Sequence, residues 1–125
     1  MTERVLVDSS AWVEAMRKRG DPAARSAVAD LLRSGAAVVC DFVRLELWNG
    51  ARGQEEKAWL RALEESVETL ETTEGVWEET RDLARRCRSK GITIPSSDLL
   101  IAACASEHRT GLLHRDAHFD RLKEI

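Results

Sequence analysis

Four acidic residues, Asp8, Glu46, Asp98 and Asp116, each stand within or beside a short apolar run of the sequence. If the fold brings them together, their charges repel. Two like charges about 4 Å apart cost roughly 1 kcal/mol in water and about 4 kcal/mol at an effective dielectric constant near 20. Such a cluster needs a positive partner. Carboxylate oxygens in this number suit hard divalent ions, Mg2+ or Mn2+, which also hold the phosphate groups of substrates.

Each of these residues alone also has an ordinary structural explanation. Asp8 could cap a helix that begins beside it, Asp98 in a first helical turn would complement the helix dipole, and Asp116 could shape a turn. Glu46 is flanked by leucines in a largely apolar segment, where an unpartnered carboxylate is costly to bury. A single shared site accounts for all four residues together.

Short apolar runs that alternate with helical patterns predict the elements that must position these carboxylates. Strands are predicted over residues 4–8, 36–40, 67–70 and 111–114. In the first half of the chain, helices are predicted from Ser9 or Ser10, from Pro22 to Gly35, and from a cap at Asp41 to about Gly50. A further amphipathic helix contains Trp59, Leu60 and Leu63 and runs to about Glu65. Helices are also predicted from Thr72 or Thr73 to Lys90, from Pro95 through Ala105, and as a last turn over 119–122. This alternation is typical of an α/β fold with a mainly parallel sheet of short strands and helices on both faces.

The predicted sheet places three of the acidic residues at one edge. Active sites of such sheets form in the crevice beyond the carboxyl ends of the strands. Asp8 ends the first strand and Asp116 lies two residues past the last one, while Asp98 falls in the first turn of the most apolar helix. We therefore expect Asp8, Asp98 and Asp116 to face the same rim, with Glu46 just beyond the second strand.

Length and composition favour one compact domain over residues 1–125, with 43% hydrophobic and 33% charged residues. The three cysteines are too few and too far apart for a disulfide framework or a zinc pair, so reduced thiols and a cytoplasmic location are expected. Nothing approaches the roughly 18 apolar residues of a membrane span. The net charge of -3 argues against nucleic-acid binding by bulk positive charge.

Several other α/β chemistries lack their sequence motifs. The chain has no GxGxxG after the first strand, no GxxxxGK[ST] and no GxSxG, and Asp8 lacks the second aspartate of an aspartyl-phosphate phosphatase. His114, Asp116 and His118 alternate in a way that could suggest zinc. That interpretation is disfavoured, because three alternating ligands fall on both sides of an extended chain.

Four segments in this order resemble the PIN-domain ribonucleases, and within them the VapC toxins of bacterial toxin–antitoxin pairs. The resemblance spans residues 4 to about 122 and is carried by Asp8-Ser9-Ser10-Ala11-Trp12, Arg44-Leu45-Glu46-Leu47-Trp48-Asn49-Gly50, Asp98-Leu99-Leu100-Ile101-Ala102-Ala103 and Leu113-His114-Arg115-Asp116-Ala117-His118-Phe119. It implies a three-layer α/β/α domain with a sheet of four or five strands. It also implies endonucleolytic hydrolysis of RNA by water that Mg2+ or Mn2+ activates.

The resemblance also assigns roles to individual residues. Asp8, Glu46, Asp98 and Asp116 match the four acidic positions of the family, which bind the ion. Ser10 falls where the family often has a small polar residue that hydrogen-bonds within the cluster, although a helix cap explains it equally well. His118 stands where members carry aspartate or histidine before a phenylalanine, and its role is open.

Partners follow from the same resemblance. It implies an RNA substrate, a VapB-type antitoxin whose tail crosses the active-site groove, and a homodimer or a higher assembly with the antitoxin. Arg44, Arg115 or the arginines of residues 81–88 could hold the RNA backbone. The helices around Trp48, Trp59 and Trp77 could supply protein interfaces, although burial in the core is favoured for each tryptophan.

Two other functions stay open on the sequence alone. One is a non-catalytic module of the same fold that binds RNA or protein, which the intact set of four carboxylates argues against. The other is a magnesium enzyme acting on a small phosphorylated substrate, which the lack of a glycine-rich phosphate loop makes less attractive.

Overall fold

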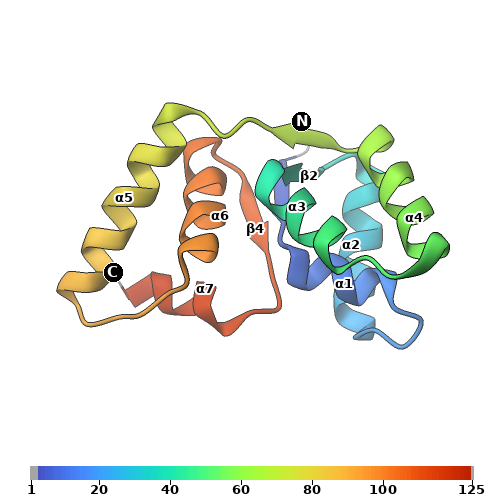
Figure 1. Ribbon diagram of the computed structural model, residues 1–125, viewed down its shortest axis with the longest axis horizontal. Coiled ribbons are helices and arrows are strands. Elements are labelled where there is room, and N and C mark those ends of the chain that lie inside the picture. The colour runs from blue at the N-terminus through green and yellow to red at the C-terminus, as the bar shows by residue number, and fades with distance from the viewer. Residues whose placement is uncertain (1–2, 125) are drawn as a thin grey trace.

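The computed structural model describes residues 3–124 and shows short parallel strands enclosed by helices (Figure 1). The elements follow one another as β1 (Val5–Val7), α1 (Ser9–Met16), α2 (Pro22–Ser34), β2 (Ala37–Cys40), α3 (Asp41–Gly50), α4 (Gly53–Ser66), β3 (Glu68–Leu70), α5 (Glu74–Ser89), α6 (Ser96–Glu107), β4 (Gly111–Leu113) and α7 (Ala117–Arg121), with a 3-10 turn over Leu122–Glu124. The predicted α/β class is confirmed, with four strands in the described part of the chain.

The strands form one sheet in the order β3-β2-β1-β4, and every pair is parallel. Val5 of β1 lies level with Ala37 of β2 on one side and with Gly111 of β4 on the other. The chain therefore winds outward in one direction from β1 and returns to its other side with β4. Such a reversal of strand order opens a crevice at the carboxyl ends of the two strands where it occurs, β1 and β4.

The sheet is covered on both faces. Successive side chains of a strand point to opposite faces, yet all four residues of β2 are buried. Helix α6 packs between α5 and α3, and seven of its twelve residues are buried, as its nearly uniform apolar sequence predicted. Trp12 of α1 is completely buried and packs edge-on against Trp59 of α4, with ring centroids 6.0 Å apart. The three layers are thus held by a continuous apolar core.

Most predicted helix ends are confirmed and one is wrong. Gly35 ends α2 with a positive φ of 73°, and the Thr73 side chain accepts a hydrogen bond from the Val76 backbone N–H at the start of α5. Asp41 was predicted to cap α3, but Cys40 holds the cap position. Asp41 instead lies inside the first turn, where its carboxylate pairs with Arg44 at 3.3 Å.

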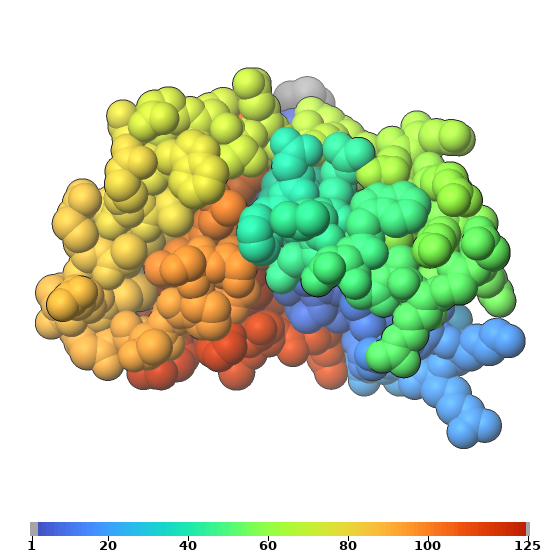
Figure 2. Space-filling view, viewed as in Figure 1, coloured from blue at the N-terminus to red at the C-terminus, as the bar shows by residue number. Residues whose placement is uncertain are grey.

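The expected burial of the tryptophans fails for one of them. Trp48 and Trp59 are half-buried, but Trp77 on α5 is 44% exposed and Leu45 on α3 is 60% exposed. Figure 2 shows α3 and α5 on the same face of the molecule, with α6 between them. Each of these two helices therefore carries one large exposed apolar side chain. None of the helices in residues 3–124 is long and apolar enough to cross a membrane.

Candidate metal centre

Asp8 follows β1 directly and lies at the bottom of a pocket at the carboxyl ends of β1 and β4. Its backbone N–H donates to the Leu113 carbonyl at 2.9 Å, which fixes the chain between the two strands. Asp8 is only 3% exposed. Its Oδ2 accepts hydrogen bonds from the Ser10 backbone N–H (3.0 Å) and from the Ser10 hydroxyl (2.5 Å).

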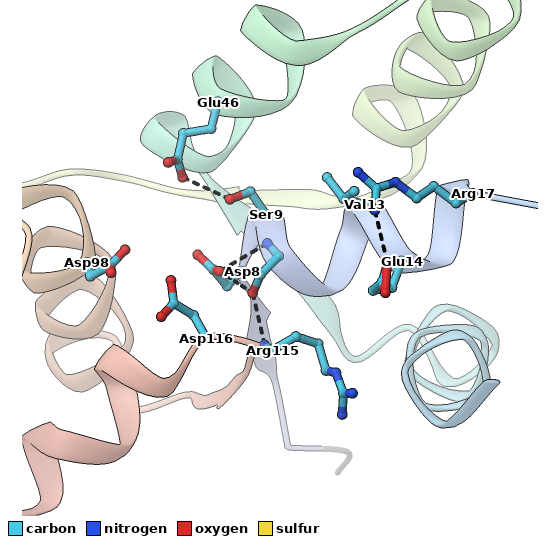
Figure 3. A pocket seen from close by; sticks show the side chains of 10 residues that line it. Asp8, Ser9, Val13, Glu14, Arg17, Glu46, Asp98, Arg115 and Asp116 are labelled. Carbon is cyan, nitrogen blue, oxygen red and sulfur yellow. Dashed lines mark hydrogen bonds and ion pairs between the residues drawn. The ribbon is translucent and has the colours of Figure 1, made fainter. Parts of the chain in front are cut away.

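The other oxygen of Asp8 has no hydrogen-bond partner among residues 3–124, although it is buried. Leaving a buried charged acceptor unsatisfied costs at least about 1–3 kcal/mol. Figure 3 shows this oxygen facing Asp98 and Asp116 rather than the body of the protein. A carboxylate oxygen placed in this way is suited to a cation held among the three side chains.

Asp98 and Asp116 complete one side of the pocket. Asp98 lies in the first turn of α6 and is 8% exposed. Asp116 precedes α7, and its Oδ1 accepts a hydrogen bond of 2.9 Å from the His118 backbone N–H. Their carboxylates point toward that of Asp8 (Figure 3). The structure thus brings together the three aspartates that the sequence placed at one rim.

Glu46 approaches the same pocket from α3. The Ser9 hydroxyl donates a hydrogen bond of 3.0 Å to Glu46 Oε1, which joins the start of α1 to α3. Burial raises the pKa of the Glu46 carboxyl, and the charges of Asp8, Asp98 and Asp116 raise it further, while the Ser9 hydrogen bond lowers it. All four predicted carboxylates therefore line one pocket, whereas the contact from Ser9 was not anticipated.

The charges in this pocket are poorly balanced. Burial raises the pKa of the Asp98 carboxyl, and so do the charges of Asp116 and Asp8, although the contact with His118 lowers it. Within residues 3–124, the ion pairs recorded for these carboxylates all involve His118. The pocket therefore holds more negative charge than its own side chains neutralise, which is the condition under which a divalent cation is stabilised.

His118 reaches the cluster in a way that the sequence pattern did not predict. The alternation of His114, Asp116 and His118 was expected to place them on both sides of an extended chain. That expectation is wrong, because α7 begins at Ala117 and turns the chain. His118 Nδ1 lies 2.9 Å from both Asp98 Oδ2 and Asp116 Oδ1. His114 packs on Phe119 instead, with ring centroids 4.9 Å apart.

Ser10 ties the two halves of the pocket together. Its hydroxyl donates to Asp8 and accepts a hydrogen bond of 2.9 Å from the Arg115 backbone N–H, so it joins the end of β1 to the loop after β4. The alternative role of Ser10 as a helix cap is wrong, because Asp8 holds the cap position of α1. Asp8 therefore caps a helix and also lines the pocket.

The candidate arginines separate into two groups. Arg44 donates to the Glu64 carboxylate through Nε (2.8 Å) and a terminal nitrogen (2.5 Å), so it fastens α3 to α4. Arg81, Arg85 and Arg86 pair with acidic residues of their own helix, α5. Arg115 lines the pocket and is half-exposed, and Arg17 joins it at the rim. Of the arginines named from the sequence, Arg115 is the one at the site.

A family profile described as PIN domain matches residues 5–125. The chain belongs to the PIN domain family. Ribonuclease VapC11 of Mycobacterium tuberculosis is 34% identical over 125 residues, which cover 97% of this chain and 92% of that protein. Ribonuclease VapC21 of the same organism is 30% identical over 128 residues, covering 100% of this chain and 90% of that protein. Within the PIN family, the chain is therefore a relative of the VapC ribonucleases.

Solved structures agree on the PIN fold. VapBC2 from Rickettsia felis, bound to a DNA fragment from its promoter, superposes with a TM-score of 0.79 at 20% identity, covering 94% of this chain and 91% of the other. VapC20 of Mycobacterium tuberculosis, described as a toxin that cleaves the sarcin-ricin loop, superposes with a TM-score of 0.69 at 18% identity, covering 94% and 93%. These likenesses establish the three-layer fold of this PIN domain.

The residues of the pocket fit a divalent metal ion. The donors are carboxylate oxygens from three aspartates and one glutamate, with one imidazole nitrogen beside them. Oxygen-rich sets of this charge suit Mg2+ or Mn2+. The buried and unpaired oxygen of Asp8 is the feature that an ion would satisfy. The chemistry of the donors and the geometry of the pocket therefore agree.

Proposed function

We propose that this PIN domain is a metal-dependent endoribonuclease of the VapC type, the toxin of a toxin–antitoxin pair. The observation that carries the proposal is the buried oxygen of Asp8, which has no hydrogen-bond partner among residues 3–124 and faces Asp98 and Asp116 in an open pocket. The identity of 30% and 34% with two VapC ribonucleases over nearly the whole chain supports hydrolysis of RNA as the reaction.

Asp8, Asp98 and Asp116 would hold the ion, which is Mg2+ or Mn2+. When bound, such an ion activates water as a nucleophile and neutralises charge that develops on the phosphate. Glu46 stands on the opposite side of the pocket with a raised pKa, so it orients the attacking water and accepts its proton. Ser9 holds Glu46 in place, and Ser10 holds Asp8.

Arg115 and Arg17 would contact the RNA backbone. Both line the rim of the pocket, and their pairs with Asp21 (3.5 Å) and Glu14 (3.6 Å) are long and exposed enough to open toward a phosphate. Contacts of this kind position a nucleic acid without reading its sequence. They would place a phosphodiester against the four carboxylates.

A VapB-type antitoxin is the proposed protein partner, since several solved structures of the same fold are complexes of a VapC with its VapB. A second hollow adjoins the pocket along α1 and α3 and is lined by apolar side chains such as Val13 and Met16 and by charged ones such as Arg17 and Arg52, so it offers such a partner both kinds of contact. The exposed Leu45 and Trp77 favour pairing of two copies through another face.

The buried free thiols agree with a reducing cytoplasm.

The function is tested by expressing the chain in bacteria without an antitoxin and mapping new RNA 5′ ends by sequencing. Three versions are compared: the wild type, Asp8→Ala, and the control Asp30→Ala, which changes an exposed aspartate on α2. We expect growth arrest and new ends with the wild type and with Asp30→Ala, and neither with Asp8→Ala. Folded protein that produces no new ends would contradict the nuclease and favour a binding module.

A further inference from the structure

His118 brings a nitrogen atom into a pocket whose other proposed ligands are carboxylate oxygens. Its Nδ1 lies 2.9 Å from Asp98 Oδ2 and 2.9 Å from Asp116 Oδ1. One ligand atom from each of these three residues lies within 4.8 Å of the others. The His118 backbone N–H donates to Asp116 Oδ1 at 2.9 Å, which fixes the backbone that carries the imidazole, and Nδ1 hydrogen-bonds to Asp98 Oδ2. Nδ1 is thus placed beside the carboxylates before any ion binds.

In this structure His118 Nδ1 hydrogen-bonds to Asp98 and pairs with Asp116, and the same spacing also suits ligands on one ion. Two ligand atoms held at a right angle by bonds of about 2.1 Å are separated by about 3 Å. The separations of 2.9 Å from Nδ1 to both carboxylate oxygens match this value. Asp8 gives an independent indication of an ion at this point, because its buried Oδ1 has no partner within the described residues and faces the same space.

We propose that His118 binds the same ion as Asp98 and Asp116, and that its nitrogen makes the centre favour Mn2+ and Co2+ over Mg2+. This inference rests on the proposed function, since it assumes that the carboxylates hold a divalent ion. Mg2+ is a hard ion that selects oxygen ligands, whereas affinity for a nitrogen-containing site rises from Mn2+ to Co2+. When Nδ1 donates its lone pair to the ion, the imidazole proton resides on Nε2.

The matched comparison is with His114, the other histidine beside the pocket. His114 packs on Phe119, and its Nε2 lies 3.7 Å from Asp120. Its Nδ1 accepts a hydrogen bond of 3.4 Å from the Asp116 backbone N–H, but the imidazole lies outside the cluster of Asp98, Asp116 and His118 side-chain atoms. Removing His114 takes away an imidazole of the same loop but leaves the proposed ligand. The His118 side chain is 44% exposed, so its replacement leaves little of the core uncovered.

The experiment measures ligand identity directly on protein without a histidine tag. Electron spin echo envelope modulation of bound Mn2+ detects a directly coordinated 14N nucleus, and calorimetry gives the Kd of Mn2+, Co2+ and Mg2+. We expect 14N modulation in the wild type and in His114→Ala, and none in His118→Ala. His118→Ala should weaken Mn2+ and Co2+ about tenfold or more, and should change the Kd of Mg2+ by less than about twofold.

His118→Asp keeps the proposal falsifiable if the alanine variant folds poorly, because it replaces the nitrogen with an oxygen ligand. It should bind Mn2+ without 14N modulation and should move the preference toward Mg2+. If the wild type binds Mn2+ through Asp98, as judged by loss of binding in Asp98→Asn, but shows no 14N modulation, the role of His118 is overturned and the proposed function stands. If the wild type binds no divalent ion, both are overturned.

Discussion

The Ser9 hydroxyl lies 3.0 Å from the Glu46 carboxylate and donates a hydrogen bond to it. Ser9 is the first residue of α1, directly after Asp8, whereas Glu46 belongs to α3. This hydrogen bond therefore fixes the position of Glu46 relative to Asp8, the residue directly before Ser9. It also stabilises the ionised form of a carboxyl whose surroundings otherwise favour protonation.

Replacing Ser9 with alanine should shift the pH dependence of RNA cleavage. The lost hydrogen bond stabilises the Glu46 carboxylate, so its removal raises the pKa of Glu46 further. The acid limb of the kcat profile should then move to higher pH, because a general base works only when ionised. Ser34→Ala, which changes an exposed serine at the end of α2, should leave the profile in place. An unchanged profile in Ser9→Ala would remove Glu46 from the role of base.

Asp98→Asn should make the metal-free protein more stable at neutral pH. Burial and neighbouring charges raise the pKa of Asp98 in the folded state, so the ionised carboxyl is disfavoured there relative to the unfolded chain. Removing the charge should add about 1 kcal/mol, or roughly 4 °C in melting temperature.

The sign of this effect fixes its pH dependence. The wild type recovers stability as the pH falls through the raised folded pKa, and the recovery is complete below the ordinary pKa of an aspartate. The advantage of Asp98→Asn should therefore shrink on acidification. Thermal unfolding with a chelator from pH 4 to 8 measures it, and Asp30→Asn should shift the melting temperature little at any pH. A wild type as stable as Asp98→Asn at pH 7 would show that the charges are already balanced.

Added metal should stabilise the wild type more than a variant that lacks one of the proposed ligands. An ion at one hundred times its Kd stabilises the folded protein by about 2.7 kcal/mol. We expect MnCl2 to raise the melting temperature of the wild type and to have much less effect on Asp116→Ala, which lacks one proposed ligand. Differential scanning fluorimetry measures both. Equal increases in the two proteins would mean that Asp116 does not hold the ion.

The local elements and the carboxylates were predictable because their signals lie within a few neighbouring residues. Asp8 and Asp116 could be assigned to one rim because each follows an apolar run, and parallel strands end at one edge. The exposure of the Trp77 side chain was not predictable from neighbouring residues. Val76 and Trp77 are adjacent apolar residues on α5, yet Val76 is completely buried and Trp77 is 44% exposed. Which of the two side chains is buried depends on how α5 packs against its neighbours, chiefly α6, which is a tertiary feature.

The position of His118 needed information that the sequence pattern did not carry. A chain that stays extended after β4 would turn His118 away from Asp116, and a single helical turn brings it back. The start of α7 at Ala117 therefore decides whether a nitrogen joins the cluster. In the same way, the contact between Ser9 and Glu46 depends on how α3 packs against α1, which is a tertiary feature.

Arg115→Ala should weaken RNA binding without lowering stability, and Arg44→Ala should do the opposite. Arg115 is half-exposed at the pocket, whereas Arg44 is occupied by the Glu64 carboxylate. In an Asp8→Ala background that does not cleave, loss of one phosphate contact should reduce the slope of log K against log salt by about one. Arg44→Ala should cost about 1 kcal/mol of stability. Fluorescence anisotropy measures RNA binding, and thermal unfolding measures stability. Equal RNA affinity in Arg115→Ala and its parent would exclude a contact between Arg115 and an RNA phosphate.

The most direct test of the metal centre is to identify the ends of RNA cut by the purified protein. If the ion held by Asp8, Asp98 and Asp116 activates water, cleavage needs Mg2+ or Mn2+, stops with a chelator, is absent in Asp98→Asn, and leaves no 2′,3′-cyclic phosphate. Mass spectrometry of the fragments identifies the chemical group at each RNA end. Cleavage that persists in the chelator, or fragments ending in a 2′,3′-cyclic phosphate, would show that the ribose 2′-hydroxyl is the nucleophile and would contradict the proposed centre.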